Sequence, residues 1–186
     1  MKQHLKLFFT ALSIFAVLNM SGQTGKLKLQ VDSLKFVSGD PLDCNAVTWR
    51  IIANKKDAIQ LLIDKLDDPT LTSAKNKHKA ANLAVADVAY LTLIKILPLP
   101  FFAVTGMQCD VIESDGYQQD IFEYMEGNRA KFKAQVQAYY DRKKDKLTWQ
   151  QFDRNHLTPC YMKNILTGST NKDFFQYGNL GYKNER

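Results

Sequence analysis

The segment of residues 81–97, ANLAVADVAYLTLIKIL, constrains the fold more than any other part of the chain. Wound into a helix, its apolar residues cover more than half of the circumference, and from Val85 to Leu97 polar side chains interrupt them only at Asp87, Thr92 and Lys95. A helix that is apolar on so many sides must be buried between neighbours. Two prolines follow residue 97 and end it. The sequence therefore predicts an all-α domain in which this helix is packed on several sides.

An amphipathic helix is expected before this segment, starting at Asp40 and Pro41. Aspartate accepts backbone N–H bonds as an N-cap, and proline suits the first helical position because its missing donor is not needed there. Apolar residues then recur at helical spacing as far as residues 53–54, where the helix is expected to end.

A second helix follows after a link of only two or three residues. Its apolar side chains share one helical face, namely Ala58, Ile59, Leu62, Ile63 and Leu66. Asp68 and Pro69 end it, because the residue before a proline avoids the helical region. So short a link predicts that these two helices pack side by side and antiparallel, with Leu62 in the core. The polar stretch 70–82 is expected to be a loop.

Residues 40–97 resemble a HEAT-like helical hairpin unit. The resemblance rests on a helix, a tight turn and the sequence AIQLLIDKLDDPT, followed by DVAYLTLIKIL. The matching positions are Ala58, Ile59, Leu62, Ile63, Leu66, Asp67, Asp68 and Pro69, with Asp87, Ala89 and Leu93 in the start of a next unit. The resemblance implies a small helical domain of HEAT-like character, since a solenoid needs three or more units. The overall layout also resembles small secreted bacterial proteins, which implies no particular activity.

The C-terminal half is expected to contain one long, interrupted helix. Residues 97–111 are apolar but broken by prolines and Gly106, which is typical of a loop lying against the core. A helical face then returns with Ile121, Met125, Phe132, Val136, Tyr139 and Tyr140. Gly127 and Asn128 are expected to break or kink the helix, with Asn128 capping the second piece, and the helix is expected to end near Lys144.

The first 22 residues have the layout of a secretory signal peptide. Lys2 and Lys6 precede an apolar run at residues 7–18, and small and polar residues follow it. This run is too short to span a bilayer, which needs about 20 residues. The mature chain is therefore expected to be exported, periplasmic or extracellular, without membrane insertion after cleavage.

The rest of the chain divides into three parts. Residues 23–39 are expected to form an extended strap, because Leu27, Leu29 and Val31 alternate with polar residues. Residues 40–165 are expected to form the helical domain, since apolar residues make up 45% of the 186 residues and supply a core. Residues 166–186 are expected to be an irregular tail.

The charge of the chain gives no support for nucleic-acid binding. Loss of residues 1–22 would leave 23 basic against 19 acidic residues, a net charge of +4 in place of +6. The basic clusters at residues 75–79 and 142–146 are short and are interpreted as a solvated loop and a solvated helix end. No nucleic-acid partner is predicted.

The cysteines permit a disulfide but predict no metal site. In an oxidising compartment Cys44, Cys109 and Cys160 allow three single pairings, and the sequence does not choose among them. His156 lies four residues before Cys160, but Pro159 interrupts any helix that would align them. No metal ligand, cofactor or catalytic residue is assigned.

Three groups of acids are the candidates for chemistry. Asp87 interrupts an apolar helix, yet a first-turn acid favoured by the helix dipole, with the helix starting at Asn82 or Ala84, is the preferred interpretation. Asp67 and Asp68 are interpreted as a helix-end turn. The third group could ligate calcium, although irregular spacing favours a solvated loop; it consists of Asp110, Glu113, Asp115, Asp120 and Glu123.

Aromatic residues form a further group with two interpretations. Aromatics anchor protein interfaces and stack on sugars, but they also fill cores, and the core is preferred here. The group comprises Trp49, Trp149, Phe101, Phe102, Tyr117, Tyr139 and Tyr140.

Two functions are therefore weighed. The first is a secreted, non-enzymatic helical domain that binds a protein or a cell-envelope component. The alternative is a hydrolase-like enzyme that uses acids around Asp87 or in the Asp110 to Glu123 group. Acid–base work requires such acids to converge within about 5 Å in a cleft.

Overall fold

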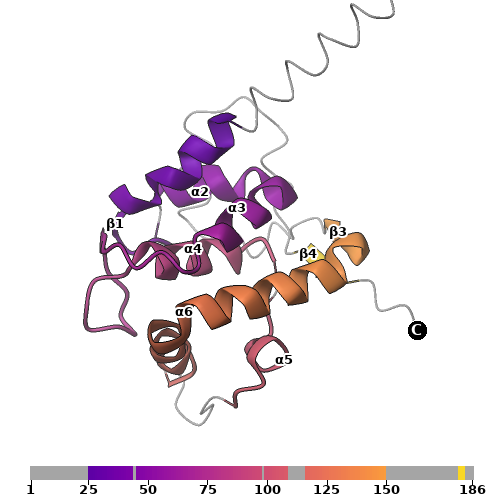
Figure 1. Cartoon of the computed structure of the whole chain (residues 1–186). Coiled ribbons are helices and arrows are strands. Elements are labelled where there is room, and N and C mark those ends of the chain that lie inside the picture. Colours follow the sequence, from indigo (N-terminus) through magenta and orange to yellow (C-terminus); the bar gives the residue numbers. More distant parts are fainter. Residues whose placement is uncertain (1–24, 44, 98, 109–115, 150–179, 183–186) are drawn as a thin grey trace, which may run out of the picture.

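The computed structural model describes residues 25–43, 45–97, 99–108, 116–149 and 180–182. Within them the chain is mostly helical, which confirms the helical character of the prediction. A first helix at residues 25–32 is followed by α2 (Ala46–Ile52), α3 (Ile59–Asp64), α4 (Val85–Leu93), α5 (Phe101–Thr105) and α6 (Gly116–Lys143). Short 3-10 turns are η1 (Ser33–Phe36), η2 (Lys55–Ala58) and η3 (Lys144–Lys146). Figure 1 shows α4 lying between the indigo and purple N-terminal helices and the orange α6.

Two small sheets accompany the helices. β1 (Ser38–Gly39) pairs in parallel with β2 (Ser73–Ala74), and β3 (Leu147–Trp149) pairs antiparallel with β4 (Leu180–Tyr182). The prediction of an irregular tail is therefore wrong for the three residues of β4. The rest of residues 166–186 and the predicted signal peptide lie outside the described residues.

The N-terminal segment is helical where an extended strap was predicted, so that prediction is wrong for residues 25–36. Leu27, Val31 and Leu34 are all buried, whereas Leu29 is 72% exposed. A strand would place Leu27 and Leu29 on the same face, but a helix groups positions i, i+4 and i+7. The apparent alternation included only three apolar residues. Leu34 completes the i, i+4, i+7 spacing with Leu27 and Val31 that is typical of a helix.

α2 begins five residues later than predicted, so the expected start at residues 40–41 is wrong. Its N-cap is Asn45, whose side chain accepts the backbone N–H groups two and three residues ahead at 3.0 and 3.4 Å. Asp40 instead accepts the N–H two residues ahead of itself at 2.8 Å and closes a turn. The predicted end near residues 53–54 is confirmed.

The apolar stripe of the next helix is buried as predicted. It is carried by η2, α3 and the turn that follows, and all five side chains have an exposed fraction of 0%: Ala58, Ile59, Leu62, Ile63 and Leu66. Both α2 and α3 pack against α4, which is their principal shared partner. The short link predicts that α2 and α3 pack side by side and antiparallel, but η2 occupies that link and packs against both helices.

α4 starts four residues later than the predicted helix because the chain that enters it is paired in extended form, and it ends four residues earlier, at Leu93. All nine of its residues are buried, as the apolar pattern requires. The backbone N–H of Thr72 donates to the carbonyl of Leu83 at 2.9 Å, and that of Leu83 donates to the carbonyl of Ala74 at 2.9 Å. The buried Thr72 hydroxyl also donates to Leu83 at 2.8 Å. The loop predicted at residues 70–82 is therefore held along the start of α4.

α5 forms where residues 97–111 were predicted to be a loop, so that prediction is wrong for the five residues of this helix. Pro100 is its N-cap, and Gly106 ends it with a φ of 72°, a left-handed conformation that glycine adopts without strain. Within α5, the side chain of Phe101 is buried, whereas that of Phe102 is 66% exposed.

α6 bends at the predicted position. Asn128 has a non-helical backbone conformation, with φ −138° and ψ 29°, and Figure 1 shows the two parts of α6 meeting at an angle. The amide nitrogen of Asn128 donates to the carbonyl of Tyr124 at 3.0 Å, in the first part of the helix. Among the described hydrogen bonds, the side-chain oxygen of Asn128 accepts none from the second part, so the predicted cap is not formed. The predicted end near residue 144 is confirmed.

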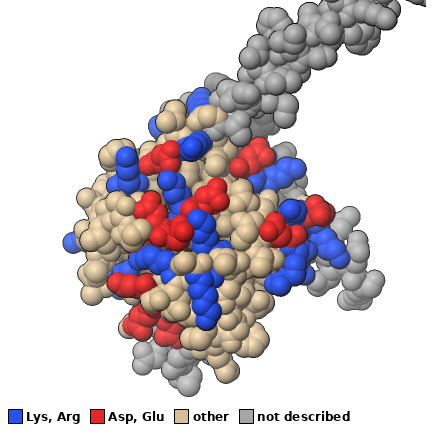
Figure 2. Space-filling model, viewed as in Figure 1, with Lys and Arg blue, Asp and Glu red and all other residues tan. Residues whose placement is uncertain are grey.

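Charges of both signs are mixed on the surface. On the face shown in Figure 2, Lys and Arg side chains are interspersed with Asp and Glu. Within the described segments, no helix combines the length and apolarity needed to cross a membrane. The basic cluster at residues 75–79 is not uniformly solvated as predicted, because the side chain of Lys79 is only 10% exposed. At the other cluster Lys144 pairs with Asp141 at 3.2 Å.

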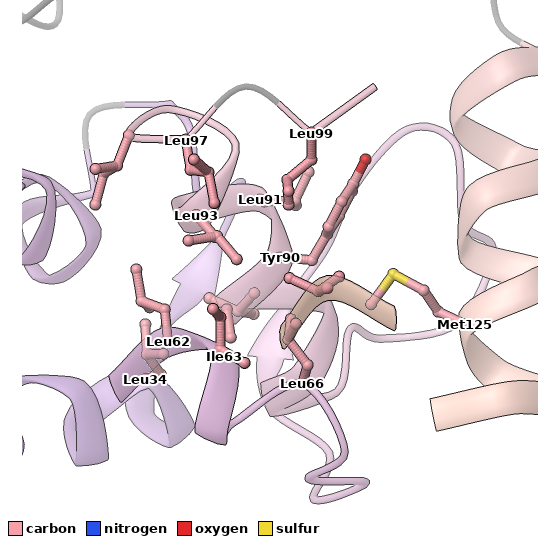
Figure 3. Packing of buried hydrophobic residues seen from close by; sticks show 14 of the residues in the cluster. Leu34, Leu62, Ile63, Leu66, Tyr90, Leu91, Leu93, Leu97, Leu99 and Met125 are labelled. Carbon is pink, nitrogen blue, oxygen red and sulfur yellow. The ribbon is translucent and has the colours of Figure 1, made fainter. Parts of the chain in front are cut away.

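The core lies around α4. Figure 3 shows Leu62 beside Leu34, and Met125 reaching from α6 toward Leu66 and Tyr90. On the α6 side, aromatic rings pack edge to face, and the ring centres of Phe132 and Tyr90 are 5.8 Å apart. The buried polar or charged residues among those described are Thr48, Thr72, Asp87 and Thr92. Asp87 is the charged member of that set.

Candidate functional site

Asp87 lies in the first turn of α4 and has an exposed fraction of 0%. Burial of a carboxylate is strongly unfavourable unless hydrogen bonds and opposite charges compensate it. Its Oδ2 accepts the backbone N–H of Ala84 at 2.9 Å and the ammonium of Lys79 at 2.9 Å. Its Oδ1 accepts from the guanidinium of Arg129 at 3.1 Å. Both oxygens of Asp87 are therefore satisfied by protein donors.

The position of Asp87 follows from the local sequence. Ala84 is the N-cap of α4, and its own methyl group cannot accept a hydrogen bond. Asp87, three residues later, reaches back to the N–H of Ala84, which is the half of a capping box that the third residue of a helix supplies. The negative charge also lies at the positive end of the helix dipole. This confirms the interpretation of Asp87 as a first-turn acid of a helix that starts at Ala84.

Lys79 joins this acid to α6. Its ammonium lies 2.9 Å from Asp87 and 3.3 Å from Oε2 of Glu126. Arg129, whose side chain is 15% exposed, reaches Asp87 from the same helix as Glu126. Two acids and two bases thus form a neutral cluster, here named the Asp87 cluster, that connects residues 75–82, α4 and α6. A cluster with balanced charge fixes these elements relative to one another.

A pocket of about 530 Å³ lies beside the Asp87 cluster, between residues 77–81 and the first part of α6. This volume falls within the range of small-molecule sites, roughly 300–1,000 Å³. Lys77 and Lys79 supply positive charge from one segment, Glu123 and Glu126 supply negative charge from α6, and Ala80, Ala81 and Phe122 are apolar. The lining residues are Lys77, His78, Lys79, Ala80, Ala81, Gln119, Phe122, Glu123 and Glu126. We name this the 77–81/α6 pocket.

Two charged groups of this pocket retain hydrogen-bonding capacity. The ammonium of Lys79 has three N–H groups; it donates to Asp87 and forms an ion pair with Glu126 at 3.3 Å. Oε1 of Glu123 accepts from Gln119 at 2.9 Å, while its second oxygen has no partner among the described residues. The pocket therefore offers a donor on one wall and an acceptor on the other.

The Asp67 and Asp68 pair is a helix-end turn, as predicted. Oδ1 of Asp68 accepts the backbone N–H of Thr70 at 3.0 Å, and both oxygens of Asp67 lie 3.0 Å from the ammonium of Lys133. Partial burial would raise the pKa of Asp68, but its bonds with Thr70 and the nearby positive charges of Lys65 and Arg129 outweigh burial and hold that pKa below its ordinary value of 3.8. Each acid has its own partner.

The acidic group at residues 110–123 is only partly described. Asp110, Glu113 and Asp115 lie outside the described residues, while Asp120 and Glu123 lie on α6. Of the described residues, no three His, Cys, Asp or Glu side chains gather closely enough to hold a metal ion. The three cysteines also lie outside the described residues, so the predicted disulfide choice is not decided.

Most described aromatics of the predicted group contribute to the core, as preferred. Phe101 and Tyr139 are buried, and Trp49 and Tyr140 are half-buried and pack against the core. Phe102 is the exception, at 66% exposure. Trp149 and Tyr117 have side chains outside the description.

The partners of Asp87 are not evident from the sequence pattern. A charged residue inside an otherwise apolar helix was itself a signal that a base must lie close, because a buried carboxylate needs compensation. Lys79, eight residues earlier, was assigned to a solvated loop. Arg129 lies 42 residues away and no sequence spacing connects it to Asp87, so only the tertiary structure identifies it.

No known family model matches this chain, and the searches of curated proteins and of solved structures likewise returned no match.

Proposed function

We propose that this chain is an exported, non-enzymatic helical domain that binds a protein or a cell-envelope component through the 77–81/α6 pocket. The observation that carries the proposal is the pocket itself, with one cationic and one anionic wall built beside the Asp87 cluster. A few polar groups that converge on a hollow of this size are the usual features of a binding site.

The burial and the hydrogen bonds of Asp87 favour binding over hydrolysis. A general acid or base must reach the proton that it transfers, within about 3.2 Å of the substrate atom or through one water. Asp87 is fully buried and both of its oxygens accept bonds from Ala84, Lys79 and Arg129. Its carboxylate therefore supports the wall of the pocket and does not line it.

The HEAT-like character of the helical body is part of this proposal. α3 carries the apolar stripe on which the resemblance rests, and it packs against α4, the next helix of the proposed unit. Helical repeat surfaces commonly serve as binding surfaces. Export is also part of the proposal, and protein recovered from the native host should have an intact mass that lacks residues 1–22.

Blocking the pocket tests the proposed function. Ala81 is exposed and lines the pocket, so Ala81→Trp should fill the hollow without disturbing the core. The full chain, immobilised and exposed to an envelope fraction, should retain a defined component that Ala81→Trp loses. Lys28→Trp is the matched control, since Lys28 is exposed on the helix at residues 25–32 and does not line the pocket. Equal retention by all three proteins would contradict binding at this site.

A further inference from the structure

We infer that the 77–81/α6 pocket takes a short zwitterionic peptide, whose carboxylate bonds to the ammonium of Lys79 and whose ammonium group pairs with Glu123. This inference rests on the proposed function and specifies its ligand. It depends on three properties of the pocket: the remaining donor of Lys79, the remaining acceptor of Glu123, and the near balance of charge over the whole lining.

The carboxylate end is assigned to Lys79 because of how its ammonium is held. Asp87 fixes it at 2.9 Å and is buried, whereas Glu126 contacts it at 3.3 Å and has a side chain that is 64% exposed. The third N–H of Lys79 has no acceptor among the described residues. A ligand carboxylate can use that donor and can also displace Glu126, the weaker and more exposed of the two partners, while the pair with Asp87 remains.

The ammonium end is assigned to the α6 wall. Glu123 and Glu126 are three residues apart, so they lie on the same face of the helix. Glu123 is exposed and has one carboxylate oxygen without a described partner. If the ligand carboxylate displaces Glu126 from Lys79, Glu126 is left with an unpaired negative charge beside Glu123. A ligand ammonium would compensate that charge. The two ends of the ligand are therefore coupled through Glu126.

The lining also discriminates against other ligand classes. A polyanion such as a nucleic acid would meet Glu123 and Glu126, and a polycation would meet Lys77 and Lys79. Like charges brought together at a binding site oppose association, which is a common source of specificity. Ala80 and Ala81 leave room for a peptide backbone, and Phe122 adds an apolar contact. A small ligand with both charges complements the ammonium of Lys79 and the carboxylates of Glu123 and Glu126.

Three tripeptides test the inference. Trialanine carries both charges, N-acetyl-trialanine lacks the ammonium, and trialanine amide lacks the carboxylate. In an NMR titration of the full chain, trialanine should shift resonances of residues 77–81 and 119–126. Each blocked peptide should bind about tenfold more weakly, because each loses one charge-assisted hydrogen bond. Equal affinity for all three, or no shift with any of them, would overturn the inference.

Two variants separate the ends of the ligand. Glu123→Gln should weaken trialanine about tenfold and remove the difference between trialanine and its N-acetylated form. Glu126→Gln should instead strengthen binding of N-acetyl-trialanine several-fold, because Lys79 loses the competing carboxylate. Asp64→Asn, on the exposed side of α3, is the control and should leave all affinities unchanged. Weaker binding of the N-acetylated peptide to Glu126→Gln would contradict the assignment of the carboxylate to Lys79.

The ligand class and the proposed function can fail separately. If no tripeptide binds but Ala81→Trp still abolishes retention of an envelope component, the ligand class is wrong and the pocket remains a binding site. If no tripeptide binds and Ala81→Trp retains the component as the wild type does, both are wrong.

Discussion

At the residue scale, Asp87 connects parts of the chain that are far apart in the sequence. Its carboxylate bonds to the N–H of Ala84 within its own helix, to Lys79 in the preceding segment and to Arg129 on α6. The two bases are themselves largely buried, at 10% and 15% side-chain exposure. Removal of the one acid that both bases contact would leave positive charge in a poorly solvated place.

Asp87→Asn should therefore lower the free energy of unfolding by about 3 kcal/mol, as expected when one partner of a buried ion pair is removed. The measurement is urea unfolding of the full chain at neutral pH. Asp64→Asn is the matched control, because Asp64 is exposed and should change stability by no more than about 0.5 kcal/mol. Similar losses in the two variants would show that the Asp87 cluster does not stabilise the fold.

Asp68 gives the chain an acid-dependent contribution to stability. Although burial raises its pKa, its hydrogen bonds with Thr70 and nearby positive charges lower that pKa below 3.8 in the folded state. A carboxyl whose folded pKa is depressed stabilises the fold at pH values above its unfolded pKa. That contribution is lost as the pH falls through the folded pKa.

Asp68→Asn should accordingly reduce the loss of stability between pH 6 and pH 3, since asparagine does not titrate. Urea unfolding at both pH values, in wild type and variant, gives the two differences to compare. An identical pH dependence in the two proteins would rule out a stabilising ionised Asp68.

At the element scale, the N-terminal segment shows how a short period can mislead. Leu27 and Leu29 are two positions apart, which fits one face of a strand, but the segment is helical and places them on different faces. Leu27 is 6% exposed and Leu29 is 72% exposed. The two leucines therefore form a matched pair for testing the element.

Leu27→Ala should cost about 2 kcal/mol in the free energy of unfolding, because it removes buried apolar surface and leaves a cavity. Leu29→Ala should change the same quantity by about 0.5 kcal/mol or less, because the side chain is already in water. Urea unfolding of both variants measures the difference. Equal costs would favour an extended segment over the helix.

At the scale of the whole molecule, α4 is the element that the others cover. The segment before it is fixed by backbone pairs, since Val85 donates to the carbonyl of Thr70 at 2.8 Å and Leu83 donates to that of Ala74 at 2.9 Å. β2 in turn pairs with β1, which follows the N-terminal helix. These pairs connect the segment after the N-terminal helix, the segment after α3 and the start of α4. They thereby position residues 77–81 against α6.

Hydrogen exchange should detect this framework. The amides of Thr72, Leu83 and Val85 are expected to exchange at least about a hundredfold more slowly than those of Ala80 and Ala81, which are exposed in the same segment. Native-state exchange followed by NMR measures both sets in one sample. Uniformly fast exchange over residues 70–85 would mean that the segment is a solvated loop.

The sequence alone determined the elements whose apolar pattern is long. The stripe from Ala58 to Leu66, the buried α4 and the interrupted α6 were all predicted, because a helical period repeated over several turns leaves one arrangement that buries it. The position of Asp87 as a first-turn acid was also local information, since a helix start and its third residue lie close in the chain.

The tertiary structure decided the features that depend on contacts between distant residues. Asp40 and Asn45 are both good cap residues, and in the folded chain Asn45 caps α2 while Asp40 closes a turn. The burial of Lys79 requires Asp87 and Glu126 to meet it from two different helices. The pocket likewise exists only where residues 77–81 approach α6, because neither segment encloses a volume by itself.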